Sequence, residues 1–441
     1  MLVRRSPFLS LVAAVLFAVR PAAAQRGNTD CRPGPWSAPW TLTMSDGRPV
    51  YVDGPAPVRS SAGLAFLGAP TFVWSTPTVF ADTGAGTRSM IDPSRLAGVI
   101  RASDGDTRLV QMPAGAMRML AQRAVVRHDG SVDVFWGESP DTSYHSLSRV
   151  PEVWFARYGA GGWSAPQRLL AFDEIGWNAA YPVAQDVAGE PVLAVPVRRT
   201  TPPSDTVGIM YLRRVRDGWR RALIPASGLP PADLALAAVS DRELILAFLG
   251  SGADSPSSVE PNGVFVVRSH DAGDTWSAPQ RVAGFGVAAL NWLRLVHTRD
   301  GALHLVWSVD RELADGQRVR TIERAASRDA GASWERAAAV PNDPFVEFFD
   351  AARLGGRLLL VGRYHDDHAM AAAVIAADGP VRWERLSFDA AETPPRLAAL
   401  APDSLLLAWG SQRAGAYPLF PETPAPLLEA ATITLRCDSA P

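Results

Sequence analysis

The sequence predicts an all-β protein: a β-propeller of seven four-stranded blades, with six blades as the alternative count. Three observations lead to this prediction: a turn motif that recurs along the chain, an apolar strand that recurs in phase with it, and two cysteines near opposite ends of the chain. The chain has 441 residues, and 47% of them are apolar. Repeat architectures reach such lengths as one domain, because each repeat buries its apolar face against its neighbours.

The clearest repeat is a turn motif of the form Ser-x-Asp-x-Gly-x-Thr/Ser-Trp. It occurs at 269–276 and again at 327–334, which places the two tryptophans 58 residues apart (334 minus 276). The Asp carboxylate can accept hydrogen bonds from N–H groups of its own turn, and the Gly permits a positive φ where the chain reverses. The Trp is expected to begin the next strand and to bury its ring between neighbouring sheets.

Weaker copies of the motif keep the tryptophan or its position and lose the polar residues. With the complete copies, these positions are Trp36, Arg108, Trp163, Trp219, Trp276, Trp334 and Trp383. A spacing of about 50 residues or slightly more is typical of a propeller blade and exceeds that of most helical repeats. The copies therefore predict seven blades.

An apolar strand recurs in phase with the turns. Short apolar runs bounded by Gly, Asp and Pro are typical of buried strands. They lie at 64–67, 132–136, 192–195, 244–248, 303–307, 358–361 and 405–409. Each unit is expected to contain strand A, a tight turn, the apolar strand B, a variable loop, strand C, the motif turn and strand D.

The last unit lacks its own strand D, and we expect the N-terminus to supply it. Strand C of that unit is expected at 431–437, and residues 36–44 are expected to pair with it. This pairing closes the ring and places Cys31 beside Cys437. An even number of cysteines in an exported protein favours a disulfide, so we expect these two to be bonded, with two free thiols as the alternative.

The N-terminus is typical of a signal peptide, which we assign to residues 1–24. Arg4 and Arg5 precede an apolar segment at 8–19, and an Ala-Ala-Ala cleavage site precedes Gln25. Residues 25–441 are then one propeller domain in the bacterial periplasm or outside the cell. We expect a monomer that does not insert into the membrane after cleavage.

Charge and composition exclude several classes of function. The formal net charge is -2, which gives no electrostatic basis for binding nucleic acid or an anionic membrane surface. The sequence contains no lysine, which excludes a P-loop lysine and Schiff-base chemistry. No metal or cofactor motif is present, so we expect neither.

The complete turns match the motif called the Asp-box or BNR repeat, and the sequence resembles the sialidase-like superfamily of Asp-box propellers. That superfamily includes exo-sialidases, other glycoside hydrolases, sorting receptors and assembly factors. The resemblance implies that the boxes are structural and lie opposite the ligand site, so we do not propose Asp271 or Asp329 as catalytic.

Sialidases of this superfamily have six blades, an arginine triad, a Tyr–Glu nucleophile pair and an Asp acid/base. Their first arginine lies in a Phe/Tyr-Arg-Ile-Pro motif, of which this chain keeps only Arg59. Arg294 could be a second arginine and Tyr364 a nucleophile, but no motif surrounds either. The chain thus departs from the sialidase pattern.

The strand order places the D–A connections and the B–C loops on one face, and binding residues concentrate on such loops. The longest B–C loop is expected at 68–95 in the first unit, with Trp74, Asp82, Arg88 and Asp92 nearby as a possible lid. Polar and aromatic candidates on this face are Asp82, Glu138, Tyr144, His145, Glu174, Trp177, Asn178, Asn291, Trp292, Arg294, Arg363, Tyr364, His365 and Asp366.

Tryptophan beside Asn, Arg and carboxylates suits a sugar ligand. The alternative for Trp177 and Trp292 is packing between blades, and for 365–368 a solvated turn in place of a metal site. The sequence predicts an exported propeller that binds a glycan or protein ligand on its loop face. The alternative is a sialidase-like glycoside hydrolase, which would require two carboxylates, or a Tyr–Glu pair with clustered arginines, at the centre of this face.

Overall fold

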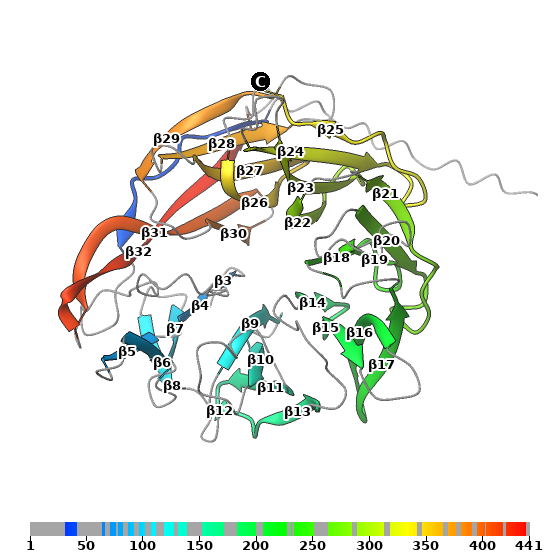
Figure 1. Cartoon of the computed structure of the whole chain (residues 1–441), viewed down its shortest axis with the longest axis horizontal. Helices are drawn as coiled ribbons and strands as arrows, with labels where there is room; N and C mark the ends of the chain where they lie inside the picture. The colour runs from blue at the N-terminus through cyan, green and yellow to red at the C-terminus, as the bar shows by residue number, and fades with distance from the viewer. Residues whose placement is uncertain are drawn as a thin grey trace, which may run out of the picture.

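The computed structural model in Figure 1 shows antiparallel sheets arranged around a common centre. The described residues are 31–41, 64–66, 71–75, 78–82, 87–91, 97–101, 107–111, 119–127, 131–138, 152–171, 183–199, 206–226, 231, 233–250, 263–284, 289–312, 318–341, 346–364, 369–375, 381–389, 395–401, 403–417 and 420–437. Every regular element in these ranges is a β-strand. Within them there is no helix long and apolar enough to cross a membrane.

The first three sheets follow the chain in order. The first contains β3 (Leu64–Phe66), β4 (Thr71–Ser75), β7 (Ala97–Arg101) and β8 (Thr107–Gln111). The second contains β9 (Met119–Val126), β10 (Val132–Glu138), β11 (Glu152–Gly159), β12 (Gly162–Trp163) and β13 (Gln167–Leu170). The third contains β14 (Val183–Val187), β15 (Glu190–Arg199), β16 (Thr206–Val215) and β17 (Gly218–Pro225).

The next three sheets have four strands each, again in sequence order. The fourth contains β18 (Leu234–Ala238), β19 (Leu244–Gly250), β20 (Gly263–Ser269) and β21 (Gln280–Gly284). The fifth contains β22 (Ala289–His297), β23 (Leu303–Glu312), β24 (Arg318–Ser327) and β25 (Ala338–Ala339). The sixth contains β26 (Val346–Leu354), β27 (Arg357–Tyr364), β28 (Ala369–Ile375) and β29 (Trp383–Asp389).

The seventh sheet joins the two ends of the chain. It contains β30 (Arg396–Ala401), β31 (Ser404–Tyr417) and β32 (Phe420–Cys437), and β32 pairs with β1 (Cys31–Pro33) and β2 (Trp40–Thr41). In this antiparallel pairing, Cys31 lies opposite Cys437. The N-terminal segment thus pairs with strand C of the last sheet, as two short strands in place of the one expected at 36–44.

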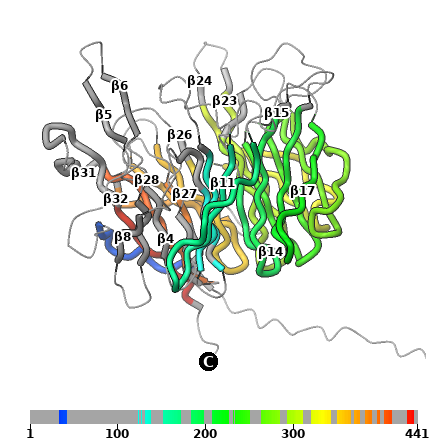
Figure 2. The backbone as a smooth tube through the Cα atoms, turned by 90° about the horizontal axis from the view of Figure 1, so that it is seen from below, coloured from blue at the N-terminus to red at the C-terminus, as the bar shows by residue number. Residues whose placement is uncertain are grey.

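The first strand of each sheet is the innermost one. These strands contact one another in the order β3, β9, β14, β18, β22, β26 and β30, and β30 contacts β3. Seen from the side, the strands of the third sheet, such as β14 and β17, run between the two faces of the molecule (Figure 2). Any side chain placed at the same level of several inner strands therefore lies near the same centre.

The predicted apolar runs form the second strand of six sheets, where they are buried. In the fourth sheet all of β19 is buried, and in the fifth Leu303, Leu305, Val306 and Trp307 are completely shielded from solvent. Such runs are buried on both faces because each sheet packs between two neighbours, which explains why their sequence is apolar apart from Asp133 and His304.

The first sheet corrects one expectation. Residues 64–66 form the innermost strand β3, and strand B is β4, which pairs with both β3 and β7. Trp74 is therefore in a strand and not in a loop. The segment between β4 and β7 contains the hairpin of β5 (Thr78–Asp82) and β6 (Thr87–Ile91). Two short apolar runs follow each other here, and periodicity alone cannot tell which is the inner strand.

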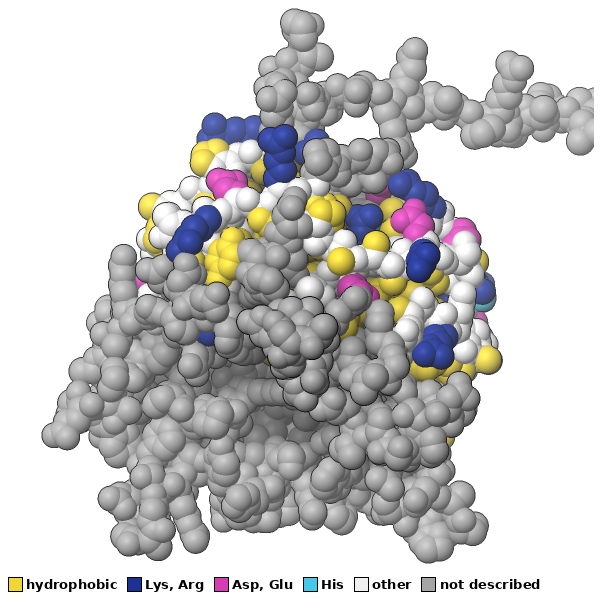
Figure 3. All heavy atoms as spheres, turned by 45° about the horizontal axis from the view of Figure 1, so that its top comes forward, with side chains coloured by type: hydrophobic (Ala, Val, Ile, Leu, Met, Phe, Trp, Pro, Cys, Tyr) yellow, Lys and Arg dark blue, Asp and Glu magenta, His cyan; other side chains and the backbone are white. Residues whose placement is uncertain are grey.

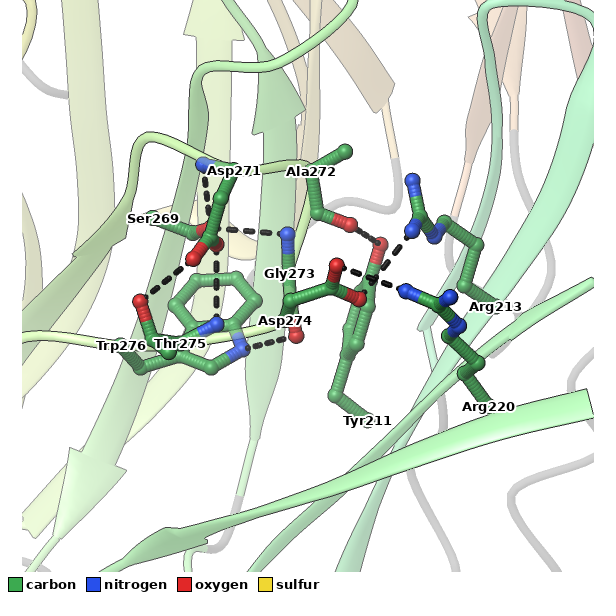
Figure 4. A network of polar contacts seen from close by, with 10 residues as sticks. All are labelled: Tyr211, Arg213, Arg220, Ser269, Asp271, Ala272, Gly273, Asp274, Thr275 and Trp276. Atoms are coloured by element: carbon green, nitrogen blue, oxygen red, sulfur yellow. Dashed lines mark hydrogen bonds and ion pairs between the residues drawn. The ribbon is translucent and has the colours of Figure 1, made fainter.

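The motif turns at 269–276 (Figure 4) and 327–334 have the expected hydrogen bonds. Asp271 accepts from the backbone N–H of Thr275 at 2.8 Å and from its hydroxyl at 2.6 Å. These bonds lower the pKa of Asp271 to about 2. Gly273 has a φ of 91°, and Ala272 before it also has a positive φ, 61°. The turn thus requires two consecutive left-handed residues.

Trp276 corrects a detail of the motif, because it precedes β21 and does not begin it. Its indole N–H donates to the carbonyl of Gly273 at 3.1 Å, and its ring meets that of Tyr211 with centroids 5.2 Å apart. The Tyr211 hydroxyl donates to the carbonyl of Ala272 at 3.3 Å. Tyr211 belongs to the third sheet, so this turn of the fourth sheet is held by its neighbour.

We predict that Gly273→Val destabilises the fold more than Gly162→Val. Both glycines have a positive φ, 91° and 88°, in which a β-branched residue costs about 1–3 kcal/mol. At Gly273 a Cβ would also overlap the ring of Tyr211, whereas nothing lies within 4 Å of a Cβ at Gly162. Urea denaturation of both variants measures the difference, and equal losses of stability would contradict the packing assigned to this turn.

Candidate functional site

Four charged side chains occupy the same level of four inner strands. In the antiparallel register, each of them lies opposite the fourth residue of the apolar run in its own sheet. The pairs are Arg123 with Phe135, Arg294 with Val306, Asp350 with Val361, and Arg396 with Ala408. We call these four residues, Arg123, Arg294, Asp350 and Arg396, the charged layer. A shared register on strands that contact one another brings them towards the centre of the molecule.

The level nearer the A–B turns is entirely apolar. The inner-strand residues that pair with the second residue of each apolar run are Val125, Ala184, Ala237, Val296, Ala352 and Ala398. The charged layer thus lies nearer than this apolar level to the end of the inner strands where the D–A connections enter. This is the face that the strand order predicts for a ligand.

Arg294 is held on two sides. Its Nε donates to Oδ1 of Asp350 at 2.5 Å, and its Nη1 donates to the carbonyl of Leu293 at 2.8 Å. The side chains of Arg294 and Asp350 are 21% and 10% exposed, so the ion pair is largely shielded. Burial opposes the charge of Arg294, but the two carboxylates of Asp350 and Asp233 outweigh it and raise the arginine pKa.

A β-bulge positions Arg294. The register of β22 against β23 shifts between Asn291 and Arg294, and Trp292 within the bulge has a φ of 55°. A left-handed conformation is strained for a large side chain. The Trp292 ring packs against the apolar cluster between the fifth and sixth sheets, in agreement with the packing alternative for this residue. Bulges commonly redirect a side chain beside a functional site.

Asp233, just before β18, links two sheets. Its Oδ1 accepts from the N–H of Leu234 at 2.9 Å, and its Oδ2 accepts from the N–H of Leu293 in the fifth sheet at 2.8 Å. Burial raises the pKa of Asp233, while Arg294 and the two N–H groups act in the opposite direction. Both carboxylate oxygens are occupied, so Asp233 serves the junction between the fourth and fifth sheets.

Asp350 links two sheets in the same way, at the junction between the sixth and seventh sheets. Its Oδ2 accepts from the N–H of Leu397 in the seventh sheet at 2.8 Å, while Oδ1 holds Arg294 of the fifth. Asp350 belongs to the sixth sheet and thus contacts both of its neighbours. Asp233, Arg294 and Asp350 form a series of polar contacts that joins four consecutive sheets at their inner strands.

Arg396 is the cation without a partner in this group. It is half-buried and has neither a hydrogen bond nor an ion pair with another described residue. Burial and the positive charge of Arg294 lower its pKa, and the carboxylates of Asp350 and Asp233 only partly compensate. The charged layer thus contains three arginines and one carboxylate, with Asp233 beside it, and is suited to receive an anion.

The structure describes only part of the predicted site. Arg294 lies in the charged layer. Arg363 is buried on β27. At the end of that strand, the Tyr364 ring lies under the guanidinium of Arg385, whose Cζ is 5.8 Å from the ring centroid. Asp82, Glu138 and Asn291 are placed as strand residues without described side chains. The predicted residues outside the described ranges are Tyr144, His145, Glu174, Trp177, Asn178, His365 and Asp366.

Arg123, Asp233, Asp350 and Arg396 were not predicted. Each is an isolated charge with no motif around it. Part of the signal was nonetheless present, because aligning the repeats on their apolar runs places Arg123, Arg294 and Arg396 at one position before the run. Asp350 lies one residue nearer to its run, and only the strand register brings it to the same level.

The face drawn in Figure 3 carries described side chains of both charges. Arginines and carboxylates are interspersed over the coloured part of the molecule in Figure 3. In the part of the chain that the structure describes, no group of three or more His, Cys, Asp or Glu side chains could hold a metal ion. Among the described inner strands, the charged layer is the level at which three arginines and one carboxylate share a register.

Comparisons with known proteins identify the fold. No family model matches the sequence, and no curated protein matches it. The solved structure of polysaccharide lyase Uly1 is similar over 87% of this chain and 91% of that chain, with 10% identity and a TM-score of 0.54. A PL25 ulvan lyase bound to -[GlcA(1-4)Rha3S]- is similar over 86% and 93%, with 12% identity and a TM-score of 0.51.

The NanB sialidase from Streptococcus pneumoniae also matches, over 91% of this chain and 93% of that chain, with 10% identity and a TM-score of 0.44. Identities this low concern the fold alone, and the argument from them uses the two lyases. Together with the sheet topology, they support the β-propeller fold predicted from the sequence.

The charged layer predicts that replacing Arg294 and replacing Arg396 change the stability of the fold by different amounts. Arg294→Met leaves Asp350 without its ionic partner in a shielded position, which we expect to cost about 2–4 kcal/mol of unfolding free energy. Arg396→Met removes a cation without a described partner that is repelled by Arg294, so stability should change by less than about 0.5 kcal/mol or rise. Urea denaturation measures both, and a loss at Arg396 as large as that at Arg294 would contradict the assigned pairing.

Proposed function

We propose that the protein binds an acidic glycan at the charged layer, on the face where the D–A connections enter. The observation that carries this proposal is Arg396, a half-buried cation without a described partner beside Arg294. A carboxylate or sulfate group would supply the missing charge and accept several N–H donors at once. The Nη2 group of Arg294, which forms no hydrogen bond with the described residues, adds donors at the same place.

The fold comparison supports a glycan as the ligand. The PL25 ulvan lyase is described as bound to -[GlcA(1-4)Rha3S]-, a saccharide that contains an acidic sugar and a sulfate group. A propeller fold similar to that of this chain can therefore hold an acidic saccharide. Trp177 and the polar loop residues predicted on the same face would add stacking and hydrogen bonds to the sugar rings.

The alternative function is a sialidase-like glycoside hydrolase. Asp233 and Asp350 do not favour it, because both oxygens of each carboxylate already accept hydrogen bonds within the protein. A hydrolase would need its acid, base or nucleophile from loop-face residues such as Glu174 or Tyr364. Turnover of a sialoside or glycoside panel that is abolished by Glu174→Gln or Tyr364→Phe would favour this alternative.

The proposal includes the architecture that presents the site. It comprises seven blades in a closed ring, a Cys31–Cys437 disulfide at the join, and export after removal of residues 1–24, leaving 25–441 as one monomeric domain. The pairing of β1 and β2 with β32 and the contact between β30 and β3 support ring closure. The sequence of the N-terminal segment supports export.

Calorimetric titration tests the proposed ligand class. We expect trigalacturonate to bind and the neutral maltotriose to bind much more weakly, with an affinity for the acidic sugar that falls as salt is added. Arg396→Gln should weaken binding of trigalacturonate by about tenfold or more, since a bond to a charged group contributes about 1.5–3 kcal/mol.

Arg299→Gln is the matched control for this titration, because Arg299 is an exposed arginine in the A–B turn of the fifth sheet, at the opposite end of the inner strands. Its affinity for trigalacturonate should equal that of the wild type. Equal affinities for the acidic and neutral sugars, or equal losses in the two arginine variants, would refute an anion site at the charged layer.

Mass spectrometry of the exported protein tests the join. Without reductant we expect one peptide pair linked through Cys31 and Cys437, since paired antiparallel strands bring their Cα atoms within the range of a disulfide. Changing both cysteines to alanine should lower the melting temperature and leave the β-sheet circular dichroism intact, because a bond that closes so long a loop contributes up to about 5 kcal/mol. Two free thiols would remove the disulfide from the proposal.

A further inference from the structure

Asp350 is the described residue that contacts both the proposed site and the next sheet. Its Oδ1 accepts from Nε of Arg294, and its Oδ2 accepts from the backbone N–H of Leu397. Leu397 directly follows Arg396 in the chain. One carboxylate therefore fixes the guanidinium of one site arginine and the backbone next to another.

These contacts leave Arg294 with one free end. Nε is bonded to Asp350 and Nη1 to the carbonyl of Leu293, whereas Nη2 has no hydrogen bond to a described residue. An arginine fixed on two sides loses little conformational entropy when a ligand binds the third. Without Asp350, the side chain would keep its charge and lose its orientation.

From this geometry we infer that Asp350 is a positioning residue, which orients Arg294 and the Arg396 backbone for an anionic ligand. The inference rests on the proposed function and adds that the site depends on the junction between the sixth and seventh sheets. It also predicts a change in anion affinity opposite to the change expected from charge alone. Removing a carboxylate beside two arginines should strengthen anion binding through charge alone, whereas loss of positioning should weaken it.

Asp233 provides the matched comparison. Like Asp350, it has an acidic side chain that accepts from the backbone N–H of the next sheet, and its charge acts on Arg294. Unlike Asp350, it forms no hydrogen bond with the Arg294 side chain, since both of its oxygens bond to backbone N–H groups. Alanine at either position removes one negative charge and the acceptor for a backbone N–H of the next sheet, but only Asp350→Ala also removes the hydrogen bond to Arg294.

The binding test is calorimetric titration of the full chain with trigalacturonate. We expect Asp350→Ala to weaken binding by about tenfold or more, because Arg294 no longer has a fixed orientation. Asp233→Ala should bind as tightly as the wild type or more tightly, because it removes an opposing charge and leaves both hydrogen bonds of the Arg294 side chain in place. Both variants should lose thermal stability. If Asp350→Ala binds as tightly as the wild type or more tightly, the positioning role is refuted.

Crystal structures of the two variants without ligand test the positioning role of Asp350 independently of the proposed function. In Asp350→Ala, the Arg294 guanidinium should leave the carbonyl of Leu293, and in Asp233→Ala it should stay. If the wild type binds no acidic sugar, the proposed function fails, and these structures still decide the positioning role: an unmoved Arg294 in Asp350→Ala overturns it. Asp350→Asn, which keeps one acceptor oxygen, replaces the alanine variant if that variant does not fold, with the same expected directions.

Discussion

Burial of the second strand of each sheet between two neighbouring sheets is the interaction on which the rest of the structure depends. Strands β19, β23 and β27 consist almost entirely of buried residues. Such strands can be shielded only if a sheet lies on each side, so every sheet requires two neighbours. The chain meets this requirement at its ends by pairing β1 and β2 with β32. The hydrophobic effect therefore sets the arrangement of the sheets before any polar contact is considered.

This packing brings the inner strands close enough for their polar groups to matter. The N–H groups of Leu293 and Leu397 receive partners from Asp233 and Asp350 of the preceding sheets. A buried carboxylate is costly unless it is hydrogen-bonded and paired with a cation. Arg294 supplies that cation, and the same pairing orients it at the proposed ligand face. Structural and functional demands thus meet in a few side chains, and mutations there should affect both.

The sequence predicted the fold well because repetition carries the signal. The six apolar runs from 132–136 to 405–409 all became second strands, and the turns around Asp271 and Asp329 formed the expected hydrogen bonds. The strand assignment predicted for the first unit was wrong, because two short apolar runs follow each other there. Only the strand pairing shows which of them forms the innermost strand. Of the charged layer, the sequence found Arg294 alone. The others are single charges whose common position appears only when strand registers are aligned, and their interactions run between sheets.

The most direct test of the central claim is a crystal structure of the wild-type protein soaked with trigalacturonate. The claim is that an acidic sugar binds at the charged layer of the inner strands. The account predicts a sugar carboxylate within hydrogen-bond distance of Arg396 and of Nη2 of Arg294, with the contact between Arg294 and Asp350 retained. A sugar bound on the face of the motif turns, or one that leaves both arginines without a contact, would contradict the account.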